Sequence, residues 1–87
     1  MLQEHRSKYE VLAQILSLLE QEDDWVKSTP IIYQCNLNFQ TWHLLYKPEL
    51  KRRGLILELK KVYRITDKGK RWLEVWYNLR AVERESF

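Results

Sequence analysis

The stretch that decides the fold is residues 50–70, which read LKRRGLILELKKVYRITDKGK. It holds two runs rich in branched and aromatic residues, 55–59 and 62–65, separated by Lys60-Lys61. Their polarity partly alternates, which is typical of a β-hairpin with one face on the core. The tip lacks the Asn-Gly or Asp-Gly pair that would identify a turn type, so the turn and the exact register stay open.

Three residues at the two ends of this hairpin indicate how it is joined to helices. Gly54 suits the left-handed conformation in which a helix ends and turns into a strand. Thr66 can cap the first free N–H groups of a following helix. Gly69, in the first turn of that helix, can permit close approach of another backbone. We therefore expect a helix before the hairpin and another after it.

The residues before the hairpin predict two helices joined by a short turn. Ser28 and Thr29 offer a hydroxyl cap before Pro30, so a short helix should begin at Pro30 and run through residue 35. Residues 36–38 favour a turn, and Asn38 caps a third helix over 39–53. This is the geometry of a helix-turn-helix, whose second helix can lie in a DNA major groove.

Pro48 lies inside the third predicted helix. Because proline lacks an N–H and disfavours helical angles at the residue before it, we expect a kink, or a split into 39–47 and 48–53, with Lys47 moved away from helical angles. The inward positions of this helix are predicted to be Trp42, Leu45 and Leu50. Those predicted to face outward are Gln40, Thr41, His43 and Lys47.

Apolar spacing predicts the remaining elements. A stripe from Tyr9 to Leu19 at spacings of three and four indicates a first helix over residues 4–21. Residues 25–27 form a short β-compatible stretch, in which Trp25 is expected in the core, as is Trp42. The last helix is predicted over 67–85, roughly 28 Å long at 1.5 Å per residue, which is more than the core of one small domain needs.

Composition bounds the possible functions. The chain has 87 residues, which suits one mainly α domain with a small β-hairpin, and its formal charge is only +3. The charge is polarised, however: residues 27–71 carry eleven basic and three acidic groups, whereas residues 1–26 carry two basic and six acidic ones. The basic excess therefore coincides with the predicted helix-turn-helix and hairpin, where phosphate contacts would be made.

Several classes of protein are not expected. One cysteine, Cys35, cannot form an internal disulfide and is interpreted as a buried apolar residue. No metal-ligand spacing, glycine-rich phosphate loop or nucleophile beside a base is present, so we expect no enzyme, metal, cofactor or small-molecule ligand. Apolar runs are too short for a secretory signal or a membrane span, which predicts a cytoplasmic protein.

Two junctions carry a resemblance to a known family. Residues 50–56 (LKRRGLI) look like the "L..+GLI" junction of recognition helix and wing, and residues 63–70 (YRITDKGK) look like the "Y.IT.KG" junction of wing and last helix. With Arg6-Ser7-Lys8 and the first helix, the chain resembles the archaeal winged helix-turn-helix proteins over roughly residues 5–80. The resemblance implies DNA binding by a dimer, paired through a C-terminal helix, as a transcriptional regulator or chromatin-like protein at the nucleoid.

The chain differs from that family pattern in two respects. Pro48 interrupts a segment that family members usually keep as one continuous helix. The spacing from Asn38 to Gly54 is also about one residue longer than the usual pattern. We therefore expect the recognition helix to be presented at an altered angle.

Candidate DNA-contacting residues follow from these positions. Side chains at the start of the third helix are candidates for reading base edges: Asn38, Phe39, Gln40, Thr41 and His43. Basic and hydroxyl groups nearby are candidates for phosphate contact: Lys27, Ser28, Thr29, Lys47, Lys51, Arg52, Arg53, Lys60, Lys61 and Arg64. Each keeps a simpler interpretation as a helix cap, core residue or solvated charge, and for Phe39 the alternatives are core or a thymine methyl.

The last helix is the candidate dimerisation element, over residues 67–87. Aromatic side chains beyond those needed by the core would form an exposed apolar patch, which usually marks an interface. The candidates are Trp72, Leu73, Trp76, Tyr77, Leu79 and Arg80. The alternative to a DNA-binding regulator is a winged helix that acts as a protein interaction module or as an architectural chromatin protein, because fold alone does not fix function.

Overall fold

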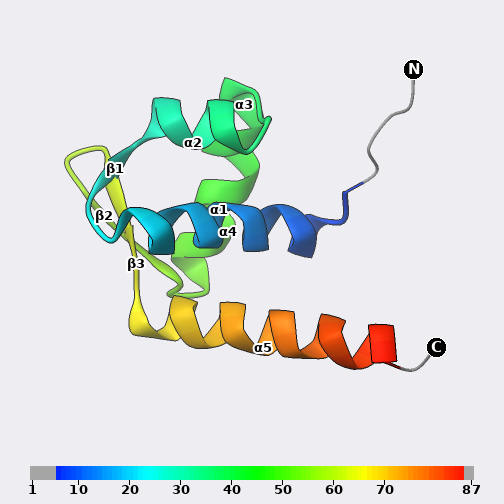
Figure 1. Ribbon diagram of the computed structural model, residues 1–87. Helices are drawn as coiled ribbons and strands as arrows, with labels where there is room; N and C mark the ends of the chain where they lie inside the picture. Colours follow the sequence, from blue (N-terminus) through cyan, green and yellow to red (C-terminus); the bar gives the residue numbers. More distant parts are fainter. Residues whose placement is uncertain (1–5, 86–87) are drawn as a thin grey trace, which may run out of the picture.

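The computed structural model describes residues 6–85, which fold mainly into helices with a small sheet, as expected from the sequence (Figure 1). The elements in chain order are α1 (Lys8–Glu22), β1 (Val26–Lys27), α2 (Ser28–Gln34), α3 (Phe39–Thr41), η1 (Trp42–Tyr46), α4 (Lys47–Arg52), β2 (Ile56–Leu59), β3 (Val62–Ile65) and α5 (Asp67–Glu85). Figure 1 shows α1 crossing the middle of the molecule, with α5 running beneath it in the opposite direction. Among the described residues, no helix combines the length and apolar character that crossing a membrane requires.

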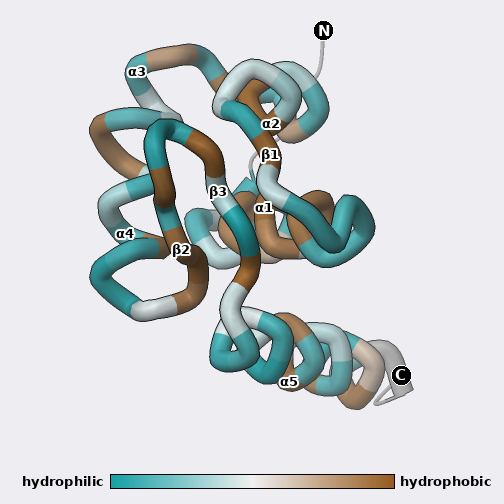
Figure 2. The backbone as a smooth tube through the Cα atoms, turned by 90° about the vertical axis from the view of Figure 1, so that its left-hand side faces the viewer, coloured by the Kyte–Doolittle hydropathy of each residue, from teal (hydrophilic) through white to brown (hydrophobic). Residues whose placement is uncertain are grey.

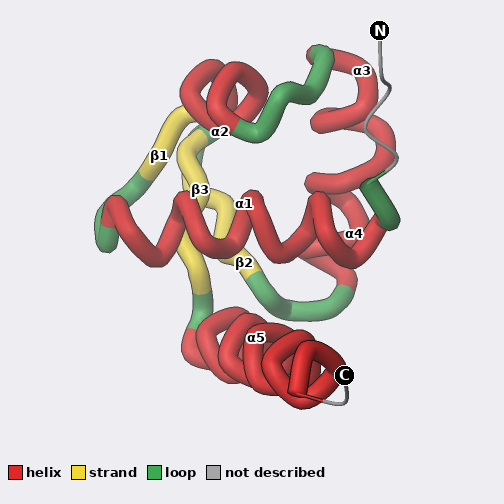
Figure 3. Tube along the Cα trace, turned by 45° about the vertical axis from the view of Figure 1, so that its right-hand side comes forward, coloured by secondary structure: helices red, strands yellow, loops and turns green. Residues whose placement is uncertain are grey.

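The sheet has three antiparallel strands in the order β1-β3-β2 (Figure 3). The expected hairpin is present, although its first strand begins at Ile56 rather than Leu55, and β1 extends it by pairing Val26 with Tyr63. Leu59 pairs with Val62 across a two-residue turn. Lys60 and Lys61 in that turn have φ of 52° and 67°, so both occupy the left-handed region that a type I′ hairpin turn requires. We call β2, this turn and β3 the wing.

The first helix begins later than predicted. Glu4 lies outside the described residues, and α1 begins at Lys8 because Ser7 forms a capping box with Glu10. The Ser7 hydroxyl accepts from the backbone N–H of Glu10, whose carboxylate accepts from the backbone N–H of Ser7. At the other end, Asp23 adopts a left-handed conformation and ends the helix.

The second helix begins earlier than predicted. Ser28 and Thr29 lie inside α2 rather than capping it, and Lys27 occupies the N-cap without a side-chain bond. The Ser28 hydroxyl is used elsewhere, because it accepts a hydrogen bond from the indole N–H of Trp42 at 3.0 Å. A tertiary contact has thus replaced the local cap.

The expected split at Pro48 is not found. Lys47 keeps right-handed helical angles (φ −61°, ψ −49°), and helical backbone continues from Phe39 to Arg52. The irregularity lies in η1, a π turn in which Lys47 donates its N–H to the carbonyl of Trp42, five residues back. A π turn takes up one residue more than an α turn, which accommodates the long spacing between Asn38 and Gly54. We call residues 39–52 the recognition segment.

The π turn also changes which side chains of the recognition segment face inward. Leu45 was predicted to be buried but is exposed, whereas Tyr46 packs against the core. Each residue of a π turn rotates the chain by less than in an α-helix, so the third residue after Trp42 falls further from its direction and the fourth comes closer to it. Trp42 and Leu50 are fully buried as predicted.

The core lies between α1, the sheet and the recognition segment. Most residues of α1 between Val11 and Leu19 are apolar and buried. Their hydropathy appears in Figure 2 as the brown portions of the α1 tube. Trp42 packs edge-on against Tyr63, with ring centroids 5.2 Å apart. Cys35 is buried, as predicted, and burial raises the pKa of its thiol to about 11. The prediction for Trp25 was wrong: it precedes β1 and is 36% exposed.

The junctions on either side of the wing match their predictions. Gly54 ends the recognition segment with φ of 72°. The Thr66 hydroxyl accepts from the backbone N–H of Gly69 at 2.9 Å and donates to the carbonyl of Gly54 at 2.7 Å. A Cβ at Gly69 would lie 2.3 Å from the Leu55 carbonyl oxygen. Only glycine therefore allows α5 to lie this close to the Leu55 backbone.

Candidate nucleic-acid interface

A groove of about 510 Å³ lies where the recognition segment, the start of α2 and the wing meet. Ten residues line it: Lys27, Ser28, Phe39, His43, Lys47, Glu58, Lys60, Lys61, Val62 and Tyr63. The fold brings them together because β1 pairs with β3 next to the hairpin tip and leads directly into α2, while the recognition segment supplies Phe39, His43 and Lys47 to the same groove. Seven of the ten were predicted as DNA-contacting residues.

Four lysines give this groove its charge. Lys27, Lys60 and Lys61 are exposed and make no ion pair with a carboxylate among the described residues. Lys47 is half-buried and contacts the His43 ring rather than a carboxylate. The positive charge of the groove is therefore available to an anion.

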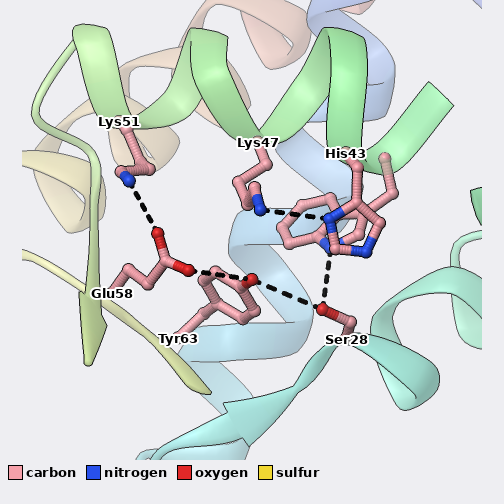
Figure 4. A network of polar contacts seen from close by, with 7 residues as sticks. Ser28, His43, Lys47, Lys51, Glu58 and Tyr63 are labelled. Atoms are coloured by element: carbon pink, nitrogen blue, oxygen red, sulfur yellow. Dashed lines mark hydrogen bonds and ion pairs between the residues drawn. The ribbon is translucent and has the colours of Figure 1, made fainter. Parts of the chain in front are cut away.

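A chain of hydrogen bonds forms one wall of the groove and fixes the wing against the recognition segment (Figure 4). Lys51 donates to one oxygen of Glu58 at 2.6 Å, and the Tyr63 hydroxyl donates to the other at 3.2 Å. The hydroxyls of Tyr63 and Ser28 lie 3.4 Å apart. The bond from Lys51 holds the pKa of Glu58 below its ordinary value, so this carboxylate stays ionised and committed to its partners.

His43 lies in the groove one turn after Phe39. Its Nδ1 is 3.0 Å from the Nζ of Lys47 (Figure 4). Partial burial, followed by the charges of Lys47 and Lys61, lowers the pKa of His43, and Glu58 opposes this only in part. At neutral pH the ring is therefore uncharged.

Besides Leu45, two large apolar side chains are exposed on the recognition segment. Phe39 is 68% exposed, so the alternative that placed it in the core is wrong. Its ring lies beside His43, with centroids 4.2 Å apart. Leu44 is 77% exposed and was not among the sequence candidates. Its position one turn after Gln40 was the signal that could have identified it, because residues four apart share a helix face.

The remaining base-reading candidates divide into a cap and an exposed residue. Asn38 and Thr41 form a reciprocal cap, in which the Asn38 side chain accepts from the Thr41 backbone N–H at 2.8 Å and the Thr41 hydroxyl accepts from that of Asn38 at 3.2 Å. Gln40 is exposed. Both side chains of the cap are engaged in starting the recognition segment.

A second cluster of basic residues has a different environment. Glu49 is buried, with its side chain 8% exposed, and it forms ion pairs with Arg52 and Arg53 on its own helix and with Lys8 of α1 at 3.7 Å. The bond from Arg53 is the main cause that holds the pKa of Glu49 below its ordinary value. We call these four residues the Glu49 cluster. It attaches the end of the recognition segment to α1.

Several phosphate candidates therefore already have protein partners. Arg52 and Arg53 pair with Glu49, Lys51 pairs with Glu58, and Arg64 lies 3.8 Å from Asp23. Ser28 is held by Trp42 and Tyr63, whereas Thr29 is exposed. The pattern Glu49-x-x-Arg52-Arg53 was the missed signal, because oppositely charged residues three and four apart pair on a helix.

Apolar side chains gather on α5 beside the start of α1. Tyr9, Trp72, Val75, Trp76 and Leu79 form this surface, which we call the α5 face, and they line a hollow of about 660 Å³ together with Lys68 and Arg71. Trp72 and Trp76 stack with planes 4° apart. Val75 and Leu79 are exposed.

The residues predicted for the dimer interface lie in different environments. Leu73 is 1% exposed and belongs to the core, so its prediction as an interface residue is corrected. Arg80 lies over the Trp76 ring and 3.4 Å from Glu10 of α1. Tyr77 is exposed and lines two other hollows, one with Glu20 and one with Glu10, rather than the α5 face. Residues 86–87 of the predicted dimerisation segment lie outside the described residues.

The family described as winged helix-turn-helix matches residues 5–84. No curated protein and no solved structure matches the chain.

Proposed function

We propose that this chain, which belongs to the winged helix-turn-helix family, binds double-stranded DNA through the groove and acts as a small transcriptional regulator. The recognition segment would enter the major groove, while the lysines of the wing and of β1 contact phosphates on either side. A cytoplasmic location at the nucleoid follows from this proposal.

The observation that carries the proposal is that the four groove lysines form no ion pair with a carboxylate among residues 6–85. Beside the groove, the charges of Arg52, Arg53 and Lys51 are satisfied by Glu49 and Glu58. Lys27, Lys47, Lys60 and Lys61 instead converge on one concave surface with the exposed start of a recognition segment. A polyanion that reaches the base edges and the backbone together fits this surface.

The wing tip supplies a second support. Lys60 and Lys61 both have positive φ, a conformation that Asn and Gly adopt at lower cost. A turn with lysine at both positions gives up local stability and places two ammonium groups at the rim of the groove. Phosphate contact by the wing would account for lysine at both positions despite this cost in stability.

The proposal is tested by titrating the protein with random-sequence duplex at two salt concentrations, about 50 mM and about 200 mM. If several phosphates are contacted, affinity falls by roughly a hundredfold or more between the two. Absence of binding at the lower salt concentration would remove the proposal.

We also propose that the chain forms a homodimer through the α5 face. Val75 and Leu79 are exposed on α5 beside half-buried Trp76, and an apolar strip along one helix can pair with its own copy about a two-fold axis. A second copy would supply a second groove for the other half-site of a DNA duplex.

The dimer is tested by sedimentation at micromolar concentration. Leu79→Glu should shift the protein to monomer, because the charge would be buried in the interface. Leu57→Glu is the matched control, since Leu57 is similarly exposed but lies on the wing. A monomer in the unaltered protein, or a dimer insensitive to Leu79→Glu, would contradict the interface.

One observation favours a second candidate function, protein interaction through the wing. Leu57 and Leu59 alternate with Ile56 and Glu58 along β2, and both leucines are exposed. An apolar wing face suits a protein partner better than a phosphate backbone. This candidate is tested with Leu57→Glu. If the variant binds DNA with unchanged, salt-sensitive affinity, the groove binds DNA and the exposed leucines of the wing take no part in that binding.

A further inference from the structure

Phe39 and His43 form a two-part recognition surface at the exposed start of the recognition segment. They lie four residues apart, so they share a helix face, and their ring centroids are 4.2 Å apart at an angle of 46°. Both line the groove. One ring offers an apolar surface and the other a polar edge, side by side.

Lys47 determines which polar edge His43 presents. A lysine ammonium can only donate hydrogen bonds, so the Nδ1 of a neutral His43, 3.0 Å from the Nζ of Lys47, must accept. The ring hydrogen is then on Nε2. His43 therefore presents a hydrogen-bond donor to a ligand, and Lys47 acts as a positioning residue for that donor.

Among the four bases, one carries a methyl group and a hydrogen-bond acceptor on its major-groove edge. Thymine has the C5 methyl and O4, whereas guanine offers two acceptors without a methyl, and cytosine offers the N4 amino donor. Adenine has an acceptor and a donor but no methyl. An apolar ring beside a fixed donor matches the thymine edge in both parts.

The geometry points to the Phe39–His43 pair as a thymine reader, in which the Phe39 ring contacts the C5 methyl and the His43 Nε2–H donates to O4. This inference rests on the DNA binding proposed above and adds to it a base preference with two separable contributions. Because the two contacts use different atoms of the base, each can be removed without the other.

The experiment starts from the protein's own preferred duplex. Random duplexes are enriched by binding to the unaltered protein, and the enriched site is synthesised with single replacements of each thymine. Deoxyuridine removes only the methyl, and 5-methylcytosine paired with guanine keeps the methyl but replaces O4 with an amino donor. Affinities are measured by fluorescence anisotropy.

One thymine position should respond to both replacements. Deoxyuridine should weaken binding about fourfold, which corresponds to the removal of one methyl group from an apolar contact. 5-Methylcytosine should weaken it about tenfold or more, because the His43 donor then faces another donor.

Variants assign each effect to one side chain. In Phe39→Ala, thymine and deoxyuridine should bind equally at that position, and Phe39→Leu should restore part of the difference. In His43→Ala, the penalty for 5-methylcytosine should largely disappear, because the donor that faced the amino group is gone, while the deoxyuridine penalty remains. Tyr33→Ala is the control, because it removes an exposed aromatic side chain of α2 outside the groove and should retain both penalties.

The outcomes separate this inference from DNA binding itself. If the protein binds no duplex at low salt, the proposed function fails and the thymine reader fails with it. If duplexes bind but no sequence is enriched, or if no thymine of the enriched site responds to deoxyuridine, the thymine reader is wrong while DNA binding stands. Retention of both penalties in Phe39→Ala and His43→Ala would also overturn it.

Discussion

The groove lysines and the Glu49 cluster show two uses of positive charge within one small domain. Lys60 and Lys61 stand at the wing tip without a carboxylate partner among the described residues. Arg52 and Arg53, only a few residues away in sequence, close onto buried Glu49. Basic residues of equal formal charge therefore differ in availability, because a paired cation must give up its partner before it can bind phosphate.

Removal of the groove charges should have the largest effect. In the triple variant Lys47→Gln, Lys60→Gln, Lys61→Gln, the affinity for random duplex at about 0.1 M salt should fall roughly a hundredfold, because fewer lysines reach phosphates and fewer counterions are released on binding. Anisotropy titration measures this, with circular dichroism as a check of folding. A fall of less than about threefold would place the phosphate contacts elsewhere.

A change in the Glu49 cluster should lower the stability of the protein rather than its affinity for DNA. Glu49→Ala leaves Lys8, Arg52 and Arg53 close together without their common partner, so the melting temperature should fall by several degrees. DNA affinity of the folded protein should stay the same or rise, because the arginines become available. A variant with unchanged melting temperature and abolished DNA binding would reverse the roles of the two groups.

The wing tip allows stability and binding to be separated at the same two positions. Replacing Lys60-Lys61 by Asn-Gly should raise the free energy of unfolding by about 1 kcal/mol, because both residues have positive φ and this pair favours a type I′ turn. The same change should weaken DNA binding about tenfold or more, as two positive charges are removed. Urea unfolding and anisotropy provide the two measurements, and a gain in both would contradict a phosphate role.

The smallest effect is expected in acid. The folded-state pKa of Glu49 and that of Glu58 lie below their ordinary value, owing mainly to the bonds from Arg53 and Lys51. Their stabilising contribution is therefore present above the ordinary carboxyl range and is lost as pH falls through that range toward the folded values. Urea unfolding should show stability falling below about pH 4.5, less steeply in Glu49→Gln. An equal slope in that variant would remove Glu49 from the cause.

The sequence predicted those features that depend on local chemistry. Gly54, Thr66 and Gly69 were placed correctly, since a left-handed helix end, a hydroxyl cap and a close backbone approach each demand a particular residue type. The strands and α5 followed from residue type and apolar spacing for the same reason.

The features that were missed depend on tertiary context. Pro48 indicated a split, but helical backbone continues through it, and a π turn upstream turned Leu45 outward. Ser28 left its local cap for a bond with Trp42, which is distant in sequence. The division of basic residues into paired and unpaired groups required the positions of Glu49 and Glu58 relative to both helices and the wing. Charge along the chain located the candidate interface but did not distinguish its members.

The division of labour between the two basic groups implies that the groove lysines, and not the arginines of the Glu49 cluster, neutralise DNA phosphates. The most direct test is the dependence of duplex affinity on salt for the unaltered protein, for Lys60→Ala with Lys61→Ala, and for Arg52→Ala with Arg53→Ala. We expect the slope of log affinity against log salt to become shallower by about two in the lysine variant and to stay unchanged in the arginine variant. A slope that changes in the arginine variant and not in the lysine variant would show that the assignment is wrong.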